Sequence, residues 1–126
     1  MELCRRAVDA GAALLVIGDT DSSVFPQELR SYTEERTQGD IRINLLVNYG
    51  WQWDVAAVPQ RLRSSDVSRI DLVVRWGGRR RLSGFLPMQC AYADIHVIDA
   101  LWPEMREEQF IAALHWYERQ DVTLGG

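Results

Sequence analysis

Four apolar runs constrain the fold of this 126-residue chain more than any other feature of its sequence. They occupy residues 13–17, 41–47, 70–74 and 95–98. The first and third are nearly continuous in Val, Ile and Leu rather than alternating with polar residues. Continuous apolarity is typical of strands that are buried on both faces, as in a parallel sheet. We therefore expect four strands with parallel neighbours.

Helical patterns lie around these runs. The expected helices are residues 2–10, 27–38, 84–93 and 107–119, with at most a short helix within 51–68. The second has Pro26 at its start and Gly39 after its end, which is the usual asymmetry of helix boundaries. Strands that alternate with helices predict right-handed βαβ units. The expected fold class is α/β, an open and mainly parallel sheet of about four strands with helices on both faces.

Length and composition fit one soluble domain over residues 1–126, because 47% of the residues are hydrophobic. The net charge of −4 argues against non-specific nucleic-acid binding. No apolar run approaches the ~20 residues that a membrane-spanning helix needs. We expect a cytoplasmic chain, and peripheral contact with a membrane stays open. Cys4 and Cys90 are interpreted as small core residues.

The turn after the third run is the strongest candidate for a ligand site. Ligands in open α/β sheets bind beyond the carboxyl ends of the strands. Here Arg75 precedes Gly77 and Gly78, three consecutive arginines follow, and Ser83 is expected to cap the next helix. All 14 basic residues are arginine, whose planar guanidinium suits phosphate oxygens. This pattern predicts a diphosphate site, with a solvated basic turn as the alternative.

Other chemistry has little support in the sequence. Asp94 could hold Mg²⁺ if substrate phosphates supplied further oxygens, although a lone aspartate at a strand start is usually structural. His96 and His115 lack metal-ligand spacing with each other and with the cysteines. No phosphate-binding glycine motif or Ser/His/Asp arrangement is present.

Residues 75–103 resemble the C-terminal signature of the cis-prenyltransferases, the undecaprenyl and related polyprenyl diphosphate synthases. Weaker similarities precede it at Asn48-Tyr49-Gly50 and at Gly18-Asp19. The residues that carry the main resemblance are Arg75, Gly77, Gly78, Arg81, Ser83, Phe85, Gln89, Tyr92, Asp94 and Leu101-Trp102-Pro103. The chain is similar to the C-terminal half of that family and follows its motif order.

The resemblance implies a function. Members of the family add isopentenyl diphosphate to an allylic diphosphate with Mg²⁺ and create cis double bonds. By position, Arg75, Arg81 and Ser83 are implied to hold the diphosphate of isopentenyl diphosphate, in the turn that also contains Gly77 and Gly78. Asp94 stands where the family has a glutamate that ligates Mg²⁺, and its side chain is one methylene shorter.

The sequence also departs from the family. The aspartate and glycine-rich turn that bind the allylic diphosphate have no counterpart here, so the activity of the isolated chain stays open. The connection from Gly50 to Asp71 is shorter than usual, and Arg79 replaces a glutamate. Trp76 replaces a small hydroxyl residue. The family's C-terminal Arg-x-Gly, which reaches a partner's site, appears as Thr123-Leu124-Gly125.

Three hypotheses follow from this comparison. The chain retains the isopentenyl diphosphate site of a synthase and is inactive alone, which we favour. Alternatively, it is a non-catalytic partner subunit of a heteromeric synthase, or a small diphosphate-binding or structural dimer. The expected partners are a diphosphate and either a second copy of the chain or a full-length synthase.

Overall fold

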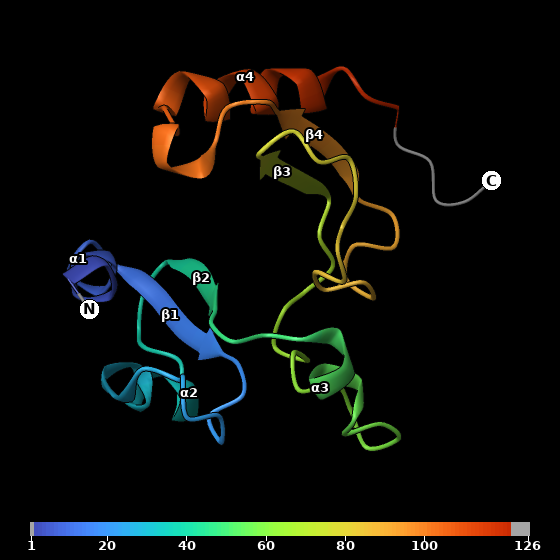
Figure 1. The fold of residues 1–126 in the computed structure, drawn as a ribbon. Helices are drawn as coiled ribbons and strands as arrows, with labels where there is room; N and C mark the ends of the chain where they lie inside the picture. Colours follow the sequence, from blue (N-terminus) through green and yellow to red (C-terminus); the bar gives the residue numbers. More distant parts are fainter. Residues whose placement is uncertain (1, 122–126) are drawn as a thin grey trace. The chain divides into compact units, whose positions relative to one another are not determined.

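The computed structural model describes residues 2–121, and the chain divides into two compact units, residues 1–67 and residues 68–126. Each unit contains one pair of parallel strands with helices beside it (Figure 1). The fold is α/β, as the sequence predicted. All four expected strands are present, and each lies parallel to the strand with which it pairs.

The first unit is built around its first strand. Its elements are α1 (Glu2–Asp9), β1 (Ala12–Ile17), the 3-10 helix η1 (Gln27–Leu29), α2 (Ser31–Glu34), β2 (Ile41–Leu46) and α3 (Trp51–Val55). β1 and β2 pair in register from Ala12 opposite Ile41 to Ile17 opposite Leu46. Every residue of β1 is buried, as its continuous apolar sequence predicts.

The core of this unit gathers apolar side chains from β1 and the helices around it. Leu14 and Val16 of β1 form one buried cluster with Cys4 of α1, Phe25 and Leu29. Cys4 is therefore a core residue, as expected, and Cys90 of the other unit is also buried with a free thiol.

The expected helix over residues 27–38 is wrong in its length. Only η1 and the single turn of α2 are helical, and the backbone is extended at Glu35. The chain then runs along β1, where Thr37 donates its backbone N–H to the Leu14 oxygen at 2.9 Å. The Arg36 guanidinium donates to the Ala13 oxygen, also at 2.9 Å. These bonds to β1 replace the hydrogen bonds that a longer helix would have formed.

The second unit consists of β3 (Leu72–Trp76), β4 (Asp94–Ile98), the 3-10 helix η2 (Trp102–Glu104) and α4 (Glu107–Glu118). Its strands pair in register from Leu72 opposite Asp94 to Trp76 opposite Ile98. α4 lies against these strands (Figure 1). The Trp76 indole N–H donates to Gln109 Oε1 of α4 at 2.9 Å. The expected helix over residues 107–119 is confirmed.

The helix expected over residues 84–93 is wrong, because this segment contains only turns. Ser83, Gly84 and Leu86 have positive φ angles of 51°, 78° and 37°, which a right-handed helix does not allow. Isolated turn bonds remain, including Cys90 N–H to the Leu86 oxygen at 2.9 Å. Consequently a long irregular loop joins β3 to β4.

Among residues 2–121, no helix combines the length and apolarity required to cross a bilayer.

Candidate functional site

The arginine-rich corner is centred on Arg75, the penultimate residue of β3. Its Nη1 donates to the backbone oxygen of Arg81 and, at 3.2 Å, to Ser83 Oγ. The structure therefore brings Arg75 together with the segment that contains Arg81 and Ser83. These are the three residues that the family resemblance implies hold the diphosphate.

Ser83 does not have the structural role that we expected. No helix follows it, and its own φ of 51° is left-handed. The corner therefore has no helix N-terminus to contribute partial positive charge to an anion. Instead, the Ser83 hydroxyl lies beside a guanidinium, where both groups can donate hydrogen bonds to the same ligand.

The backbone N–H groups of Gly77 and Gly78 connect the turn after β3 to the end of β4 by hydrogen bonds. Their φ angles of 98° and 75° suit glycine. Gly77 N–H donates to the Ala100 oxygen at 2.9 Å, and Gly78 N–H donates to the Ile98 oxygen at 3.0 Å. These two N–H groups are engaged in the fold, so the full positive charges at the corner come from guanidinium groups.

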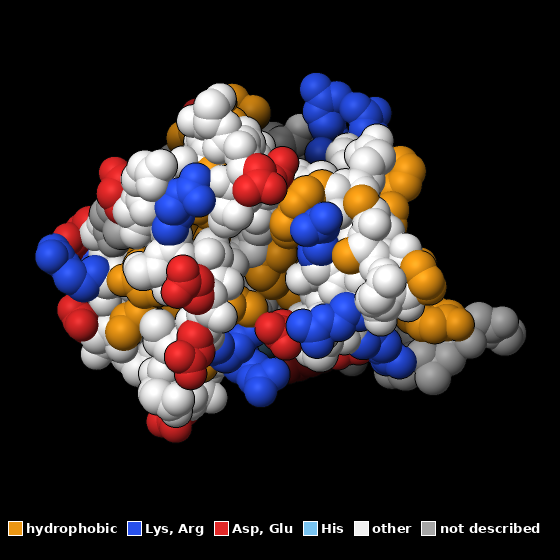
Figure 2. Space-filling model, turned by 90° about the horizontal axis from the view of Figure 1, so that it is seen from below, with side chains coloured by type: hydrophobic (Ala, Val, Ile, Leu, Met, Phe, Trp, Pro, Cys, Tyr) orange, Lys and Arg blue, Asp and Glu red, His pale blue; other side chains and the backbone are white. Residues whose placement is uncertain are grey.

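The guanidinium groups at this corner are not neutralised by ion pairs within residues 2–121. Arg79, Arg80 and Arg81 are exposed, and the described part of the chain gives none of them an acidic partner within salt-bridge distance. Figure 2 shows arginine side chains projecting from the surface of the molecule. Together with Arg75, these side chains give the corner a strongly positive character.

Asp94 lies at the other end of the strand pair. It begins β4 opposite Leu72, whereas Arg75 is opposite Val97, three residues farther on. Three residues of strand span about 10 Å. Successive side chains of a strand also point to opposite faces of the sheet, so the even-numbered residues of β3 and β4 lie on the face opposite Arg75.

The contacts with α4 identify the two faces. The Trp76 indole bonds Gln109, and the His96 ring lies 5.0 Å from the Trp116 ring, so the even-numbered residues face α4. Asp94 belongs to this set. The structure therefore does not bring Asp94 to the Arg75 corner, and no group of three His, Cys, Asp or Glu residues in the described chain is arranged to hold a metal.

Sequence reasoning missed Asp99, which follows β4 at the same corner. A Cβ atom on Gly78 would lie 3.3 Å from Asp99 Oδ1, so this carboxylate lies directly beside the glycine turn. The turn after Ile98 was among the places that the strand-end rule selects. The sequence contained no further signal that would single out this aspartate.

A second feature that the sequence did not reveal is the buried carboxylate of Asp54 in α3. Its oxygens accept hydrogen bonds from the Tyr49 hydroxyl at 2.9 Å, Ser64 N–H at 2.8 Å and the Ser64 hydroxyl at 2.6 Å. Tyr49 belongs to the Asn-Tyr-Gly motif after β2. This network holds the motif against the loop that follows α3.

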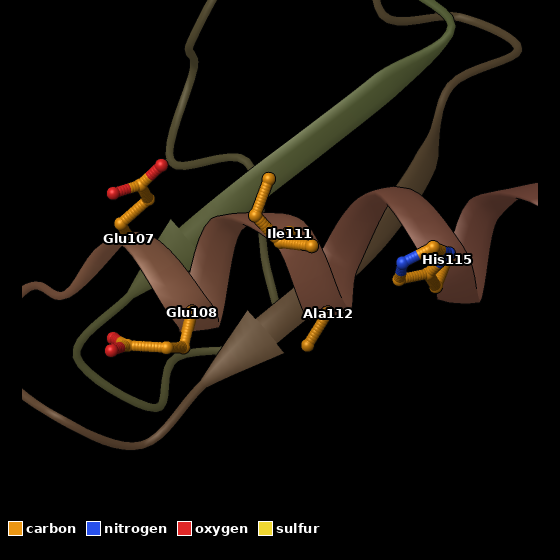
Figure 3. A pocket seen from close by; sticks show the side chains of 5 residues that line it. All are labelled: Glu107, Glu108, Ile111, Ala112 and His115. Carbon is orange, nitrogen blue, oxygen red and sulfur yellow. The ribbon is translucent and has the colours of Figure 1, made fainter.

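An open hollow of about 450 Å³ lies along α4. Figure 3 shows its lining side chains, with Glu107 and Glu108 at the N-terminal end of the helix. The other lining residues are Ile111, Ala112 and His115. The two carboxylates would repel a diphosphate, so this hollow is a poor site for the ligand that the arginines favour.

Comparison with known proteins decides the family. The family model described as "Putative undecaprenyl diphosphate synthase" matches residues 56–125, more than half of the chain. The chain belongs to this family. The match includes the whole arginine-rich corner and Asp94, and so it agrees with the resemblance that those residues indicated.

Curated relatives support the assignment. A ditrans,polycis-undecaprenyl-diphosphate synthase ((2E,6E)-farnesyl-diphosphate specific) of Pectobacterium atrosepticum is 30% identical, over the full chain and 63% of the relative. A tritrans,polycis-undecaprenyl-diphosphate synthase (geranylgeranyl-diphosphate specific) of Aeropyrum pernix is also 30% identical, over 91% of the chain and 58% of the relative. The chain thus spans about three fifths of the length of these relatives.

A solved structure of a probable undecaprenyl diphosphate synthase from Campylobacter jejuni has the same fold, with a TM-score of 0.69 and 23% identity. The match covers 99% of this chain and 72% of that one. The alignment with the Pectobacterium synthase extends over 161 positions, whereas the chain has 126 residues, a difference of 35. That synthase therefore contains internal segments that have no counterpart here. The motif Thr123-Leu124-Gly125 lies outside the described residues.

Proposed function

We propose that this chain carries the isopentenyl diphosphate side of a cis-prenyltransferase site and that it needs a complementary protein segment for turnover. The observation that supports this most is the contact of Arg75 with the Arg81–Ser83 segment at the carboxyl end of β3. The family relationship supplies the reaction class, the condensation of isopentenyl diphosphate with an allylic diphosphate.

Binding at this corner would exchange internal hydrogen bonds for bonds to the ligand. Without a ligand, one Arg75 nitrogen donates to a backbone oxygen and to a hydroxyl. Diphosphate oxygens are stronger acceptors, because they are charged and accept bidentate bonds from guanidinium groups. Arg81 and the Ser83 hydroxyl supply further donors. In this arrangement the chain orients the diphosphate and leaves the isopentenyl group free to react.

The family relationship also implies Mg²⁺, which when bound would offset charge on the diphosphate groups. Asp94 is the ligand that the sequence resemblance implies. Its position on the α4 face, about three residues of strand from Arg75, does not favour a shared site with a diphosphate held at the corner.

Turnover also requires a place for the allylic diphosphate. Positioning two diphosphates relative to each other is the main demand of this reaction. We infer that a full-length synthase, or another subunit, supplies that second site. The chain is then either a substrate-binding part of a larger enzyme or a non-catalytic partner, and we propose that it acts in the cytoplasm or at the membrane periphery.

Exposed apolar side chains favour such an association, either with a synthase or with a second copy of this chain. In the second unit, Leu101 and Trp102 are more than 60% exposed and Phe110 is 44% exposed. Large apolar side chains that are exposed to this degree are candidates for contact with a partner. The solvated apolar surface supports the partner-subunit and dimer hypotheses alongside the binding function.

Calorimetric titration of isopentenyl diphosphate into the chain tests the proposed binding. Arg81→Ala should weaken binding by about tenfold to a hundredfold, because a hydrogen bond to a charged group is worth about 1.5–3 kcal/mol. Arg5→Ala is the matched control, since Arg5 is an exposed arginine of α1 and the charge change is the same. Equal affinities of the Arg81→Ala variant and the wild type would refute the assignment.

A further inference from the structure

We propose that Trp76 is a positioning residue of the arginine-rich corner: its indole, held by α4 and η2, fixes the end of β3 and thereby aims the Arg75 side chain. This inference rests on the proposed function, because Trp76 would act on the ligand through Arg75. Trp76 is the last residue of β3 and directly follows Arg75. Its indole lies on the α4 face and Arg75 lies on the opposite face, so Trp76 itself does not touch the diphosphate.

Two contacts hold the Trp76 indole. Its N–H donates a hydrogen bond to Gln109 Oε1 of α4 at 2.9 Å. Its ring lies 5.1 Å from the Trp102 ring of η2 at an interplanar angle of 82°, which is the edge-to-face geometry that aromatic pairs favour. The side chain at the end of β3 is therefore fixed by two elements that follow β4 in the chain.

The acceptor of the indole bond is itself fixed in place. Gln109 Oε1 also accepts the Arg106 backbone N–H at 2.9 Å, and the Gln109 backbone N–H donates to the Arg106 oxygen at 3.1 Å. A carbonyl oxygen has two lone pairs, so it accepts both bonds at once. Turning the Gln109 amide away from Trp76 would therefore also cost the first turn of α4 a hydrogen bond.

The end of β3 needs an anchor of this kind. The chain continues from Trp76 into Gly77 and Gly78, and glycine restricts the backbone less than any other residue. Trp76 is thus the last side chain that can resist fraying of the strand, and Arg75 is one residue earlier. Fraying would move the Arg75 guanidinium away from the segment of Arg81 and Ser83 that it contacts.

The expected effect on affinity follows from the fraction of molecules in which Arg75 is correctly placed. When only a fraction is competent to bind, the measured Kd rises by the inverse of that fraction. Loss of the indole hydrogen bond shifts the fraction by no more than the bond is worth, which is about tenfold. Loss of the Trp76 anchor should therefore weaken binding less than loss of a guanidinium that contacts the diphosphate.

Calorimetric titration of isopentenyl diphosphate into Trp76→Phe and Gln109→Leu tests the inference. The first variant keeps an aromatic ring without the indole N–H, and the second removes the acceptor. Each should weaken binding about threefold to tenfold, and the double variant should lose no more than either single variant, because both changes break the same bond. Trp116→Phe is the matched control, since Trp116 is a half-buried tryptophan of the same unit that lies against His96.

Nuclear magnetic resonance of the arginine side chains gives a readout that a general loss of stability would not move. The Arg75 guanidinium resonance, identified by its absence in Arg75→Lys, should shift in Trp76→Phe and in Gln109→Leu. It should stay in place in Trp116→Phe, whose affinity should remain within about twofold of the wild type. An Arg75 resonance that does not shift in Trp76→Phe would overturn the inference.

The affinities allow failure of this inference to be distinguished from failure of the proposed function. An affinity of Trp76→Phe or Gln109→Leu within about twofold of the wild type, additive losses in the double variant, or an equal loss in Trp116→Phe would overturn the positioning role. The proposed function would still stand if Arg81→Ala weakens binding. A wild-type chain that does not bind isopentenyl diphosphate would overturn the proposed function and this inference with it.

Discussion

Replacing Asp54 with alanine should destabilise the first unit strongly. The side chain is 2% exposed and accepts hydrogen bonds from the Tyr49 hydroxyl and from both the N–H and the hydroxyl of Ser64. Ser64 is itself fully buried. Alanine would remove all three acceptor contacts and leave a void in the packed loop.

The size of the effect follows from these contacts. A hydrogen bond to a charged group contributes about 1.5–3 kcal/mol, and bonds that share one acceptor group are not additive. We expect a loss of about 3–5 kcal/mol in the free energy of unfolding. This loss is large compared with the ~5–15 kcal/mol that stabilises a typical domain.

Urea denaturation followed by circular dichroism measures the change. With an m-value of about 1–3 kcal/mol/M, the midpoint should fall by at least ~1 M, or the unit should be unfolded without denaturant. Asp66→Ala is the matched control, because Asp66 is an exposed aspartate of the same unit. If the two variants differ by less than ~0.5 kcal/mol, the network does not stabilise the fold as argued.

Three further predictions concern a glycine that lies against backbone, the hydrogen bond between Trp76 and Gln109, and self-association of the chain. Gly18→Ala should prevent normal folding, because its Cβ would lie 1.5 Å from the Val47 backbone oxygen, whereas Gly50→Ala should be tolerated because no atom lies within 4 Å of its Cβ. Circular dichroism distinguishes the two variants, and a folded Gly18→Ala protein would contradict this close approach. Trp76→Phe and Gln109→Leu should each cost about 1 kcal/mol, and a double-mutant cycle that shows no coupling would exclude the bond between them. Sedimentation at micromolar concentration should reveal a dimer that Phe110→Asp weakens; a monomeric wild type would count against self-association.

The strands were predictable because a strand that is buried on both faces has a continuous apolar sequence. All six residues of β1 are buried, and its apolar run marks it within one residue of its observed bounds. The third strand begins two residues later than predicted, since Ile70 N–H donates to the Gln89 oxygen before the strand starts. The local apolar pattern thus predicted which segments form strands better than it predicted the first and last residues of those strands.

The irregular loop and the face of each site residue were not predictable in the same way. Positive φ angles at Ser83 and Leu86 abolish the expected helix, yet neither residue type ordinarily adopts them. Likewise, the family resemblance implied that Arg75 holds the diphosphate and that Asp94 holds Mg²⁺ at the same site. Only the strand register shows that they lie on opposite faces and that Asp99 lies beside Gly78.

A crystal structure of the chain with isopentenyl diphosphate tests the central claim most directly. The diphosphate oxygens should lie within hydrogen-bond distance of the Arg75 and Arg81 guanidinium groups and of Ser83 Oγ. Arg75 should then have released the Arg81 backbone oxygen that it contacts in the free chain. A ligand bound elsewhere, with the Arg75 contact unchanged, would contradict the assignment of this corner as the diphosphate site.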